Sequence, residues 1–120
     1  MSASSGRAAP IDATVEIVVP VYGGLDHVRR CLTSVLGTGG GQAWHLTVID
    51  DASPDPAVSR WLREFAQLHP EVTVVANARN LGFVGTVNLG LRLAARRDVV
   101  LLNSDTEVAG DWLDRLHLAA

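Results

Sequence analysis

The feature that most constrains this fold is an alternation of two apolar patterns along the chain. Four short runs rich in valine, isoleucine and leucine are typical of strands, and each is followed by apolar residues at helical spacing. Strands and helices that alternate in this way form a parallel sheet with right-handed crossover connections. The sequence therefore predicts an α/β fold with strands at residues 15–19, 46–49, 72–75 and 99–102.

Turn and cap residues delimit the predicted elements. Pro20 is expected to end the first strand, because proline has no N–H group to donate to a sheet. The helix at residues 25–36 stops at a glycine-rich loop. Asp55 caps the second helix, Pro56 lies in its first turn and Pro70 closes it. The remaining predicted helices are residues 83–95 and one that carries Trp112, Leu113 and Leu116.

The strand order follows from the rule that a doubly wound sheet binds ligands where its strand order reverses. We expect residues 15–19 at the centre, between the second and fourth strands, with the third strand outside the second. The continuous apolar run at residues 99–102 predicts a strand buried on both faces. The carboxyl ends of all four strands then lie at one edge, which gathers Tyr22, Asp50, Asp51, Asn80 and Asp105.

Composition limits the classes of function. The 120 residues are 48% hydrophobic and 19% charged, which indicates a globular chain. The net charge of −3 argues against nucleic acid as a partner. The chain has no lysine, so mechanisms that use a Schiff-base lysine or a P-loop lysine are excluded.

Several features bear on the cellular compartment. The single cysteine, Cys31, can form no internal disulfide, and we expect it as a buried apolar side chain in a reducing compartment. No apolar run approaches the roughly 20 residues of a membrane span. Residues 1–12 have the composition of a disordered tail. We therefore expect a cytoplasmic protein that is at most peripheral to the inner face of the membrane.

Two acidic segments are candidates for ligand binding. Asp105 follows the fourth strand, where a carboxylate either holds a divalent cation and, through it, phosphates, or caps the next turn or helix. Asp50 and Asp51 end the second strand, and they either bind a ligand or form a turn and helix cap. Three carboxylates that converge on one edge favour a binding site. Surface or structural roles are expected for His27, His45, His69 and His117.

Other classes of protein share parts of this pattern. A nicotinamide oxidoreductase needs Gly-x-Gly-x-x-Gly after the first strand, where this chain has Pro-Val-Tyr-Gly-Gly-Leu. A phosphoacceptor receiver domain also gathers aspartates at strand ends, but it uses a lysine that this chain lacks. A non-catalytic nucleotide-binding or interaction module stays open as an alternative.

Four segments carry a more specific pattern in a fixed order. They read Val-Glu-Ile-Val-Val-Pro-Val-Tyr, Val-Ile-Asp-Asp-Ala-Ser-Pro-Asp, Asn-Leu-Gly-Phe-Val-Gly-Thr-Val-Asn-Leu-Gly and Leu-Leu-Asn-Ser-Asp-Thr-Glu-Val. Together they resemble the family 2 glycosyltransferases of the GT-A fold, in particular the rhamnosyltransferase-like or O-antigen type. The resemblance implies a Rossmann-like, three-layer α/β/α fold, truncated after the metal-motif strand and its following helix. Residues 13–120 would then be the nucleotide-sugar-binding half of such a domain.

The resemblance also implies the residues of a donor site. Asp105 matches the last acid of the family's Asp-x-Asp metal motif and would hold Mg²⁺ or Mn²⁺, although Asn103 stands where the first acid usually does. Asp51 matches the acid that hydrogen-bonds the base. The residues implied to contact the nucleotide-sugar are Pro20, Val21, Tyr22, Asp50, Asp51, Asn80, Gly82, Phe83, Asn88, Asn103 and Ser104.

The implied reaction transfers a sugar from a nucleotide-diphosphate-sugar donor to a glycan or lipid-linked acceptor, usually with inversion, as in bacterial cell-wall and polysaccharide biosynthesis. The metal would offset charge on the leaving diphosphate. In the family, the general base lies in the half that follows the metal motif, so the isolated chain is expected to be incomplete and inactive. An open sheet edge and uncovered apolar surface predict self-association.

Overall fold

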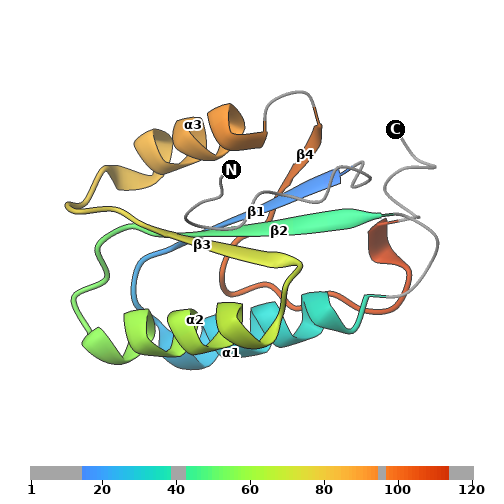
Figure 1. Cartoon of the computed structure of the whole chain (residues 1–120), viewed down its shortest axis with the longest axis horizontal. Coiled ribbons are helices and arrows are strands. Elements are labelled where there is room, and N and C mark those ends of the chain that lie inside the picture. Colours follow the sequence, from blue (N-terminus) through green and yellow to red (C-terminus); the bar gives the residue numbers. More distant parts are fainter. Residues whose placement is uncertain (1–14, 39–42, 95–96, 114–120) are drawn as a thin grey trace.

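A parallel sheet of four strands forms the middle layer of the computed structural model, which describes residues 15–38, 43–94 and 97–113 (Figure 1). The strands lie in the order β3-β2-β1-β4. The predicted order is therefore confirmed, and the carboxyl ends of the strands share one edge. The strand bounds are β1 (Val15–Val21), β2 (Trp44–Asp50), β3 (Val72–Ala76) and β4 (Asp98–Leu101).

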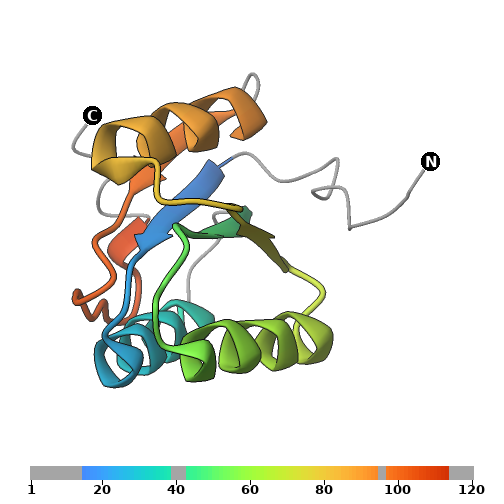
Figure 2. The ribbon, with the colours of Figure 1, turned by 90° about the vertical axis from the view of Figure 1, so that its left-hand side faces the viewer.

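Helices cover both faces of this sheet, which gives the predicted three-layer α/β/α fold (Figure 2). Two of them, α1 (Leu25–Leu36) and α2 (Pro56–Leu68), lie side by side on one face, and α3 (Gly82–Ala94) lies on the other. Asp55 caps α2 as predicted, because its carboxylate accepts the backbone N–H of Ala57 at 2.9 Å.

The strands divide their side chains between these faces with a period of two. In β1, the side chains of Val15, Ile17 and Val19 belong to the core that α1 and α2 cover. Ile17 is fully buried, as expected for a central strand. The two helices contribute Val28, Cys31, Leu32, Val35, Val58, Leu62 and Phe65 to the same core.

The opposite face of the sheet meets α3 through residues with small side chains. Thr86, Gly90 and Ala94 are the buried residues of α3, and their spacing of four places them on one side of the helix. A Cβ atom at Gly90 would lie 2.6 Å from Cγ1 of Val18. The backbone of α3 therefore lies very close to β1, with the start of the helix at the carboxyl edge of the sheet.

A buried polar network occupies this face near the amino ends of the strands. Glu16 is almost fully buried, and it accepts hydrogen bonds from the Thr47 hydroxyl at 2.7 Å and from His45 Nδ1 at 2.8 Å. Arg97 also donates to Glu16, at 3.3 Å, and His45 Nε2 is 2.9 Å from the hydroxyl of Thr73. His45 is therefore a structural residue of the sheet, far along the strands from the carboxyl edge.

Two expectations about strands are wrong. Pro20 does not end β1, which continues to Val21. Val18 directs its carbonyl toward the β4 side, where it accepts the N–H of Leu102. The backbone of Pro20, two residues later, faces the same side at a level beyond the end of β4. The missing N–H group of proline therefore removes no hydrogen bond between β1 and β4. Pairing with Ile49 continues on the other side of the strand.

The fourth strand is also not buried on both faces. Val99 and Val100 are half-buried, and Leu101 is 46% exposed. Among the described residues β4 is one of the two outer strands of the sheet, so helices cover it less completely than β1. The apolar run alone could not distinguish these two environments.

Some expectations fall outside the described residues. They concern the tail at residues 1–12, most of the glycine-rich loop, Ala95 and the body of the last predicted helix. No helix within the described ranges has both the length and the apolar character needed to cross a membrane.

Candidate functional site

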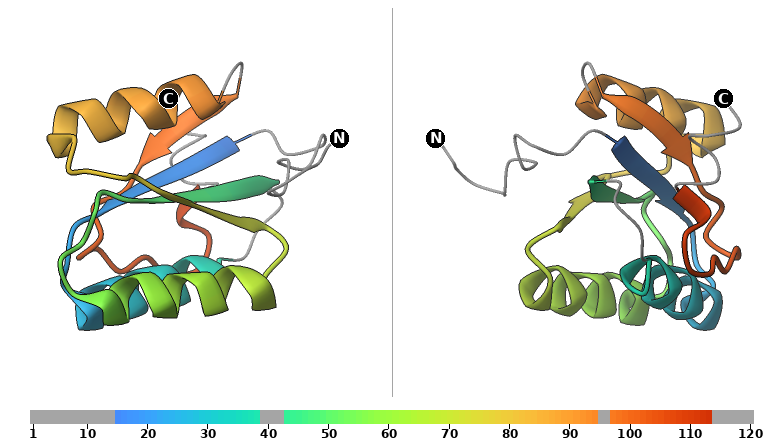
Figure 3. Two further views of the ribbon diagram at one scale, coloured as in Figure 1. Left: turned by 60° about the vertical axis from the view of Figure 1, so that its left-hand side comes forward. Right: turned by 90° about the vertical axis from the view of Figure 1, so that its right-hand side faces the viewer.

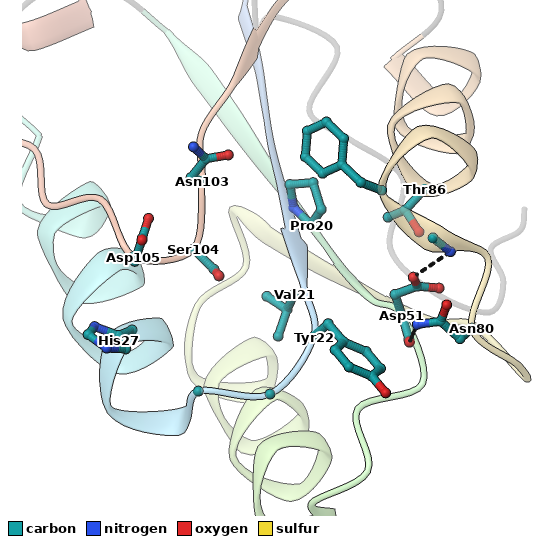
Figure 4. A pocket seen from close by; sticks show the side chains of 14 residues that line it. Pro20, Val21, Tyr22, His27, Asp51, Asn80, Thr86, Asn103, Ser104 and Asp105 are labelled. Atoms are coloured by element: carbon teal, nitrogen blue, oxygen red, sulfur yellow. Dashed lines mark hydrogen bonds between the residues drawn. The ribbon is translucent and has the colours of Figure 1, made fainter.

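A pocket of about 570 Å³ opens at the carboxyl edge of the sheet (Figure 4). It lies between the start of α1, the start of α3 and the segment that follows β4. The structure brings most of the predicted site residues together there, from the ends of all four strands and the segments that follow them. These are Pro20, Val21, Tyr22, Asp51, Asn80, Gly82, Phe83, Asn103, Ser104 and Asp105.

Asp51 connects the end of β2 to the start of α3. Its Oδ1 accepts the N–H of Leu81 at 2.7 Å and the side-chain amide of Asn77 at 2.9 Å. Its Oδ2 accepts the N–H of Gly82 at 3.0 Å, and the Asn80 side chain donates to its backbone carbonyl at 3.2 Å. The Thr86 hydroxyl is a further hydrogen-bond partner of this carboxylate. An ionised carboxylate accepts about four hydrogen bonds, so donors of the chain itself already use most of its capacity.

These contacts also set the charge of Asp51. Burial is the largest single influence and acts to raise the pKa of this carboxyl group. The hydrogen bonds from Leu81, Asn77, Thr86 and Gly82 together outweigh it, so the pKa lies below its ordinary value of 3.8. Asp51 is therefore an anion at neutral pH, suited to accept an N–H group.

Two predicted site residues are not brought to the pocket. Asp50 is buried, and its carboxylate accepts the N–H of Ser53 at 3.0 Å and the hydroxyl of Ser59 at 2.8 Å. It thus fastens the turn after β2 to α2. Asn88 is exposed on α3 and does not line the pocket.

Two exposed aromatic side chains line the same pocket. Tyr22 is 60% exposed at the end of β1, and Phe83 is 61% exposed in the first turn of α3. Gly23 and Gly24 follow Tyr22 with φ angles of 75° and 71°, a backbone conformation that favours glycine and turns the chain into α1. An exposed aromatic face can stack on a planar ring such as a nucleobase.

Asp105 lies in a turn after β4, which the N–H of Thr106 closes by donating to the carbonyl of Asn103 at 3.0 Å. Asn103, Ser104 and Asp105 all line the pocket and carry oxygen atoms, the ligands that Mg²⁺ and Mn²⁺ prefer. The described ranges contain no group of three or more His, Cys, Asp or Glu side chains that could hold a metal ion. Asn103, Ser104 and Asp105 are oxygen donors from one short segment, and such a set suits a cation whose other ligands are water or the phosphates of a bound molecule.

The sequence did not point to four further residues that line the pocket. His27 lies in the first turn of α1, and its Nδ1 is 3.2 Å from Nη2 of Arg30. Because a guanidinium only donates, Nδ1 carries no proton in this bond. The only signal for His27 was its place just after the central strand. The other three are Gly23, Gly24 and Thr86.

Residues 16–119 match the family described as glycosyl transferase family 2. The chain belongs to glycosyl transferase family 2. This membership confirms the resemblance at the level of the family and removes the oxidoreductase and receiver alternatives. The match includes all of the predicted site residues from Pro20 to Asp105.

Curated relatives of this chain are much longer than the chain itself. An uncharacterised glycosyltransferase of Haemophilus influenzae is 22% identical over 102 residues, which are 85% of this chain and 31% of that protein. The succinoglycan biosynthesis protein ExoO of Rhizobium meliloti is 33% identical over 104 residues, which are 85% of this chain and 28% of ExoO. The chain thus spans about a third or less of the length of these relatives.

Solved structures of glycosyltransferases share its fold. The structure of residues 1–349 of S. aureus TarS in complex with UDP-GlcNAc has a TM-score of 0.73 at 19% identity, and the match covers 88% of this chain and 30% of that 1–349 chain. The mannosyltransferase PcManGT of Pyrobaculum calidifontis, in complex with GDP-Man and Mn²⁺, has a TM-score of 0.70 at 23% identity. It matches 83% of this chain and 30% of PcManGT. At these identities the likeness establishes the fold.

Proposed function

We propose that this chain binds a nucleotide-diphosphate-sugar at the carboxyl-edge pocket, as the donor half of a longer glycosyltransferase. In this proposal residues 13–120 supply the donor and metal site, and the acceptor is a glycan or a lipid-linked sugar. The observation that carries it is the convergence of Tyr22, Asp51 and Asp105 on one pocket in a family 2 chain.

The nucleoside would lie on the Asp51 side of the pocket. This carboxylate lines the pocket and its depressed pKa keeps it ionised, so it suits an N–H group of a base. Tyr22 and Phe83 offer aromatic faces nearby for stacking. Nucleotide binding in the neighbouring folds supports this assignment, since TarS and PcManGT form complexes with UDP-GlcNAc and GDP-Man.

The diphosphate would lie on the Asp105 side. A divalent cation bound there supplies positive charge that stabilises the leaving diphosphate. Asp105 is the carboxylate suited to hold it, with Asn103 and Ser104 as neighbouring oxygen donors. Without a cation, an anionic diphosphate would meet two carboxylates in one pocket, and the encounter would be repulsive. Binding should therefore depend on Mg²⁺ or Mn²⁺.

Calorimetry with UDP and GDP, in Mg²⁺ or Mn²⁺ and in a chelator, tests this function. The Asp105→Asn variant should lose the metal dependence and most of the affinity while keeping its fold. Asp51→Asn should weaken binding in both conditions, because it acts on the base. Asp98→Asn is the matched control, because Asp98 is an exposed carboxylate at the opposite end of β4.

The results separate the proposal from its rivals. Equal binding by Asp105→Asn, Asp51→Asn and the parent chain, or full binding in chelator, would show that these carboxylates are only turn and cap residues. A non-catalytic nucleotide-binding module is the second candidate, because the same pocket serves it equally well. Such a module would bind the intact sugar nucleotide, but the full-length protein that contains it would transfer no sugar.

The rhamnosyltransferase-like subtype, the cytoplasmic location and self-association stay predictions.

A further inference from the structure

The segment that carries Asp105 leaves the sheet and runs along α1. Leu102 is still fixed to β1, since its N–H donates to the carbonyl of Val18 at 3.0 Å. Beyond it, the chain turns at residues 103–106 and continues toward the α1 layer, in orange to red in Figure 3. We call residues 103–108 the aspartate loop. Asp105 thus depends for its position on whatever holds this loop.

Three residues along α1 and its end make hydrogen bonds to this loop and the chain after it. The Sγ of Cys31 is 3.6 Å from the carbonyl oxygen of Asn103. The hydroxyl of Ser34 accepts the N–H of Val108 at 3.0 Å. The hydroxyl of Thr38 accepts the indole N–H of Trp112 at 2.8 Å. Positions 31 and 34 are three residues apart and share one side of α1, and Thr38 follows just beyond the end of the helix.

Ser34 is the central contact of this set. Its hydroxyl donates to the carbonyl of Cys31 at 2.7 Å, one turn earlier in the same helix. Because the proton is used there, the oxygen lone pairs are free for the N–H of Val108. The donor and acceptor capacities of one hydroxyl thus join α1 to the far end of the aspartate loop.

Cys31 of α1 also contacts the aspartate loop. Its side chain is fully buried, and its thiol can donate to the carbonyl oxygen of Asn103, which lies 3.6 Å from Sγ. That carbonyl also closes the turn around Asp105. The loop is thus held at its start by β1, in its turn by Cys31 and at its end by Ser34.

We propose that Ser34 is a positioning residue for Asp105: its hydroxyl fixes the aspartate loop on α1, so that the carboxylate meets the metal-bound diphosphate of the donor. The role rests on the proposed function, because it concerns the same pocket. Ser34 does not itself line this pocket, so it acts through the loop. A purely structural hydroxyl would change the stability of the chain without changing how strongly the metal assists nucleotide binding.

The test is the ratio of UDP or GDP affinity in Mg²⁺ to the affinity in chelator. Loss of one hydrogen bond in Ser34→Ala should lower this ratio about 2- to 10-fold. Binding in chelator should stay as in the parent chain, because the Asp51 side is intact. Thr33→Ala is the matched control: its side chain is exposed on the adjacent position of α1, and its ratio should equal that of the parent.

Two further variants and amide hydrogen exchange test whether Ser34 acts through the aspartate loop. Ser34→Thr keeps the hydroxyl and should restore the ratio. Cys31→Ala removes a second hydrogen bond to the loop, which the ion pair of Arg30 with Glu107 also contacts, and should lower the ratio even if Ser34→Ala folds poorly. Amide hydrogen exchange should show faster exchange of the Val108 N–H in Ser34→Ala than in Thr33→Ala.

Two outcomes overturn different statements. A parent chain that binds both nucleotides with metal dependence, together with an unchanged ratio in Ser34→Ala, overturns the role of Ser34 alone. A parent chain that binds neither nucleotide overturns the proposed function, and the role of Ser34 falls with it.

Discussion

Substitution of Gly90 by alanine tests how closely α3 packs on the sheet. The new Cβ would lie 2.6 Å from Cγ1 and 3.4 Å from Cγ2 of Val18, and 3.4 Å from Cδ1 of Ile49. Val18 is fully buried in the central strand, and the χ1 angle of its β-branched side chain is restricted. The strain must therefore be relieved mainly by moving α3 away from β1.

Two opposing effects set the change in the free energy of unfolding caused by Gly90→Ala. Alanine is favoured over glycine inside a helix by about 0.8–1 kcal/mol. Forcing an extra carbon into a packed interior costs about 1–3 kcal/mol. We therefore expect Gly90→Ala to lower the free energy of unfolding by up to about 2 kcal/mol. Without the contact to Val18, the same substitution would raise the free energy of unfolding.

Urea unfolding of a double-mutant cycle isolates the contact. Val18→Ala alone should destabilise the chain by about 1–3 kcal/mol, because it leaves a cavity. In the double variant, the methyl group of Ala at position 90 partly fills that cavity, so the combined cost should be about 1 kcal/mol or more below the sum. Additivity within about 0.5 kcal/mol, or a stabilised Gly90→Ala variant, would refute the close packing.

Two further predictions concern stability. The pKa of Asp51 is lowered on folding, so its contribution to stability is present above its unfolded pKa of 3.8 and is lost as the pH falls through the folded value. Thermal melts from pH 6 to pH 2 should therefore show the destabilisation of Asp51→Asn shrinking below about pH 4, and a constant difference would contradict this. Ile17→Ala should cost about 2–5 kcal/mol in urea unfolding, because Ile17 is fully buried in the central strand; a cost typical of an edge position would argue against the strand order.

Much of the fold was predictable because each strand and helix has its own apolar period. The shared carboxyl edge followed from the alternation of strands and helices, and the central position of β1 followed from the rule for strand order in doubly wound sheets. The prediction that Asp50 belongs to the ligand site could have been avoided by applying the two-residue period of side chains in a strand. Asp50 lies on the same side of β2 as Leu46 and Val48, which face the core, so its carboxylate points toward α2.

The same applies to Asn88, whose predicted place in the site could have been tested against the helical period of α3. Asn88 lies two residues from Thr86, about 200° around α3 from the side that meets the sheet. The place of His27 in the pocket was not predictable in this way, because it depends on how the chain after β4 lies over α1. That arrangement involves residues more than seventy positions apart, such as Cys31 and Asn103. No local period encodes such a contact.

The double use of Asp51 limits how this pocket can change during evolution. The carboxylate is suited to a base, yet it also holds the backbone at Leu81 and Gly82, where α3 begins. A substitution that altered base preference at this position would loosen the helix that carries Phe83 and Thr86. Under the proposed function, a shift to another nucleotide is therefore easier at Tyr22 or Phe83, whose side chains are mostly exposed.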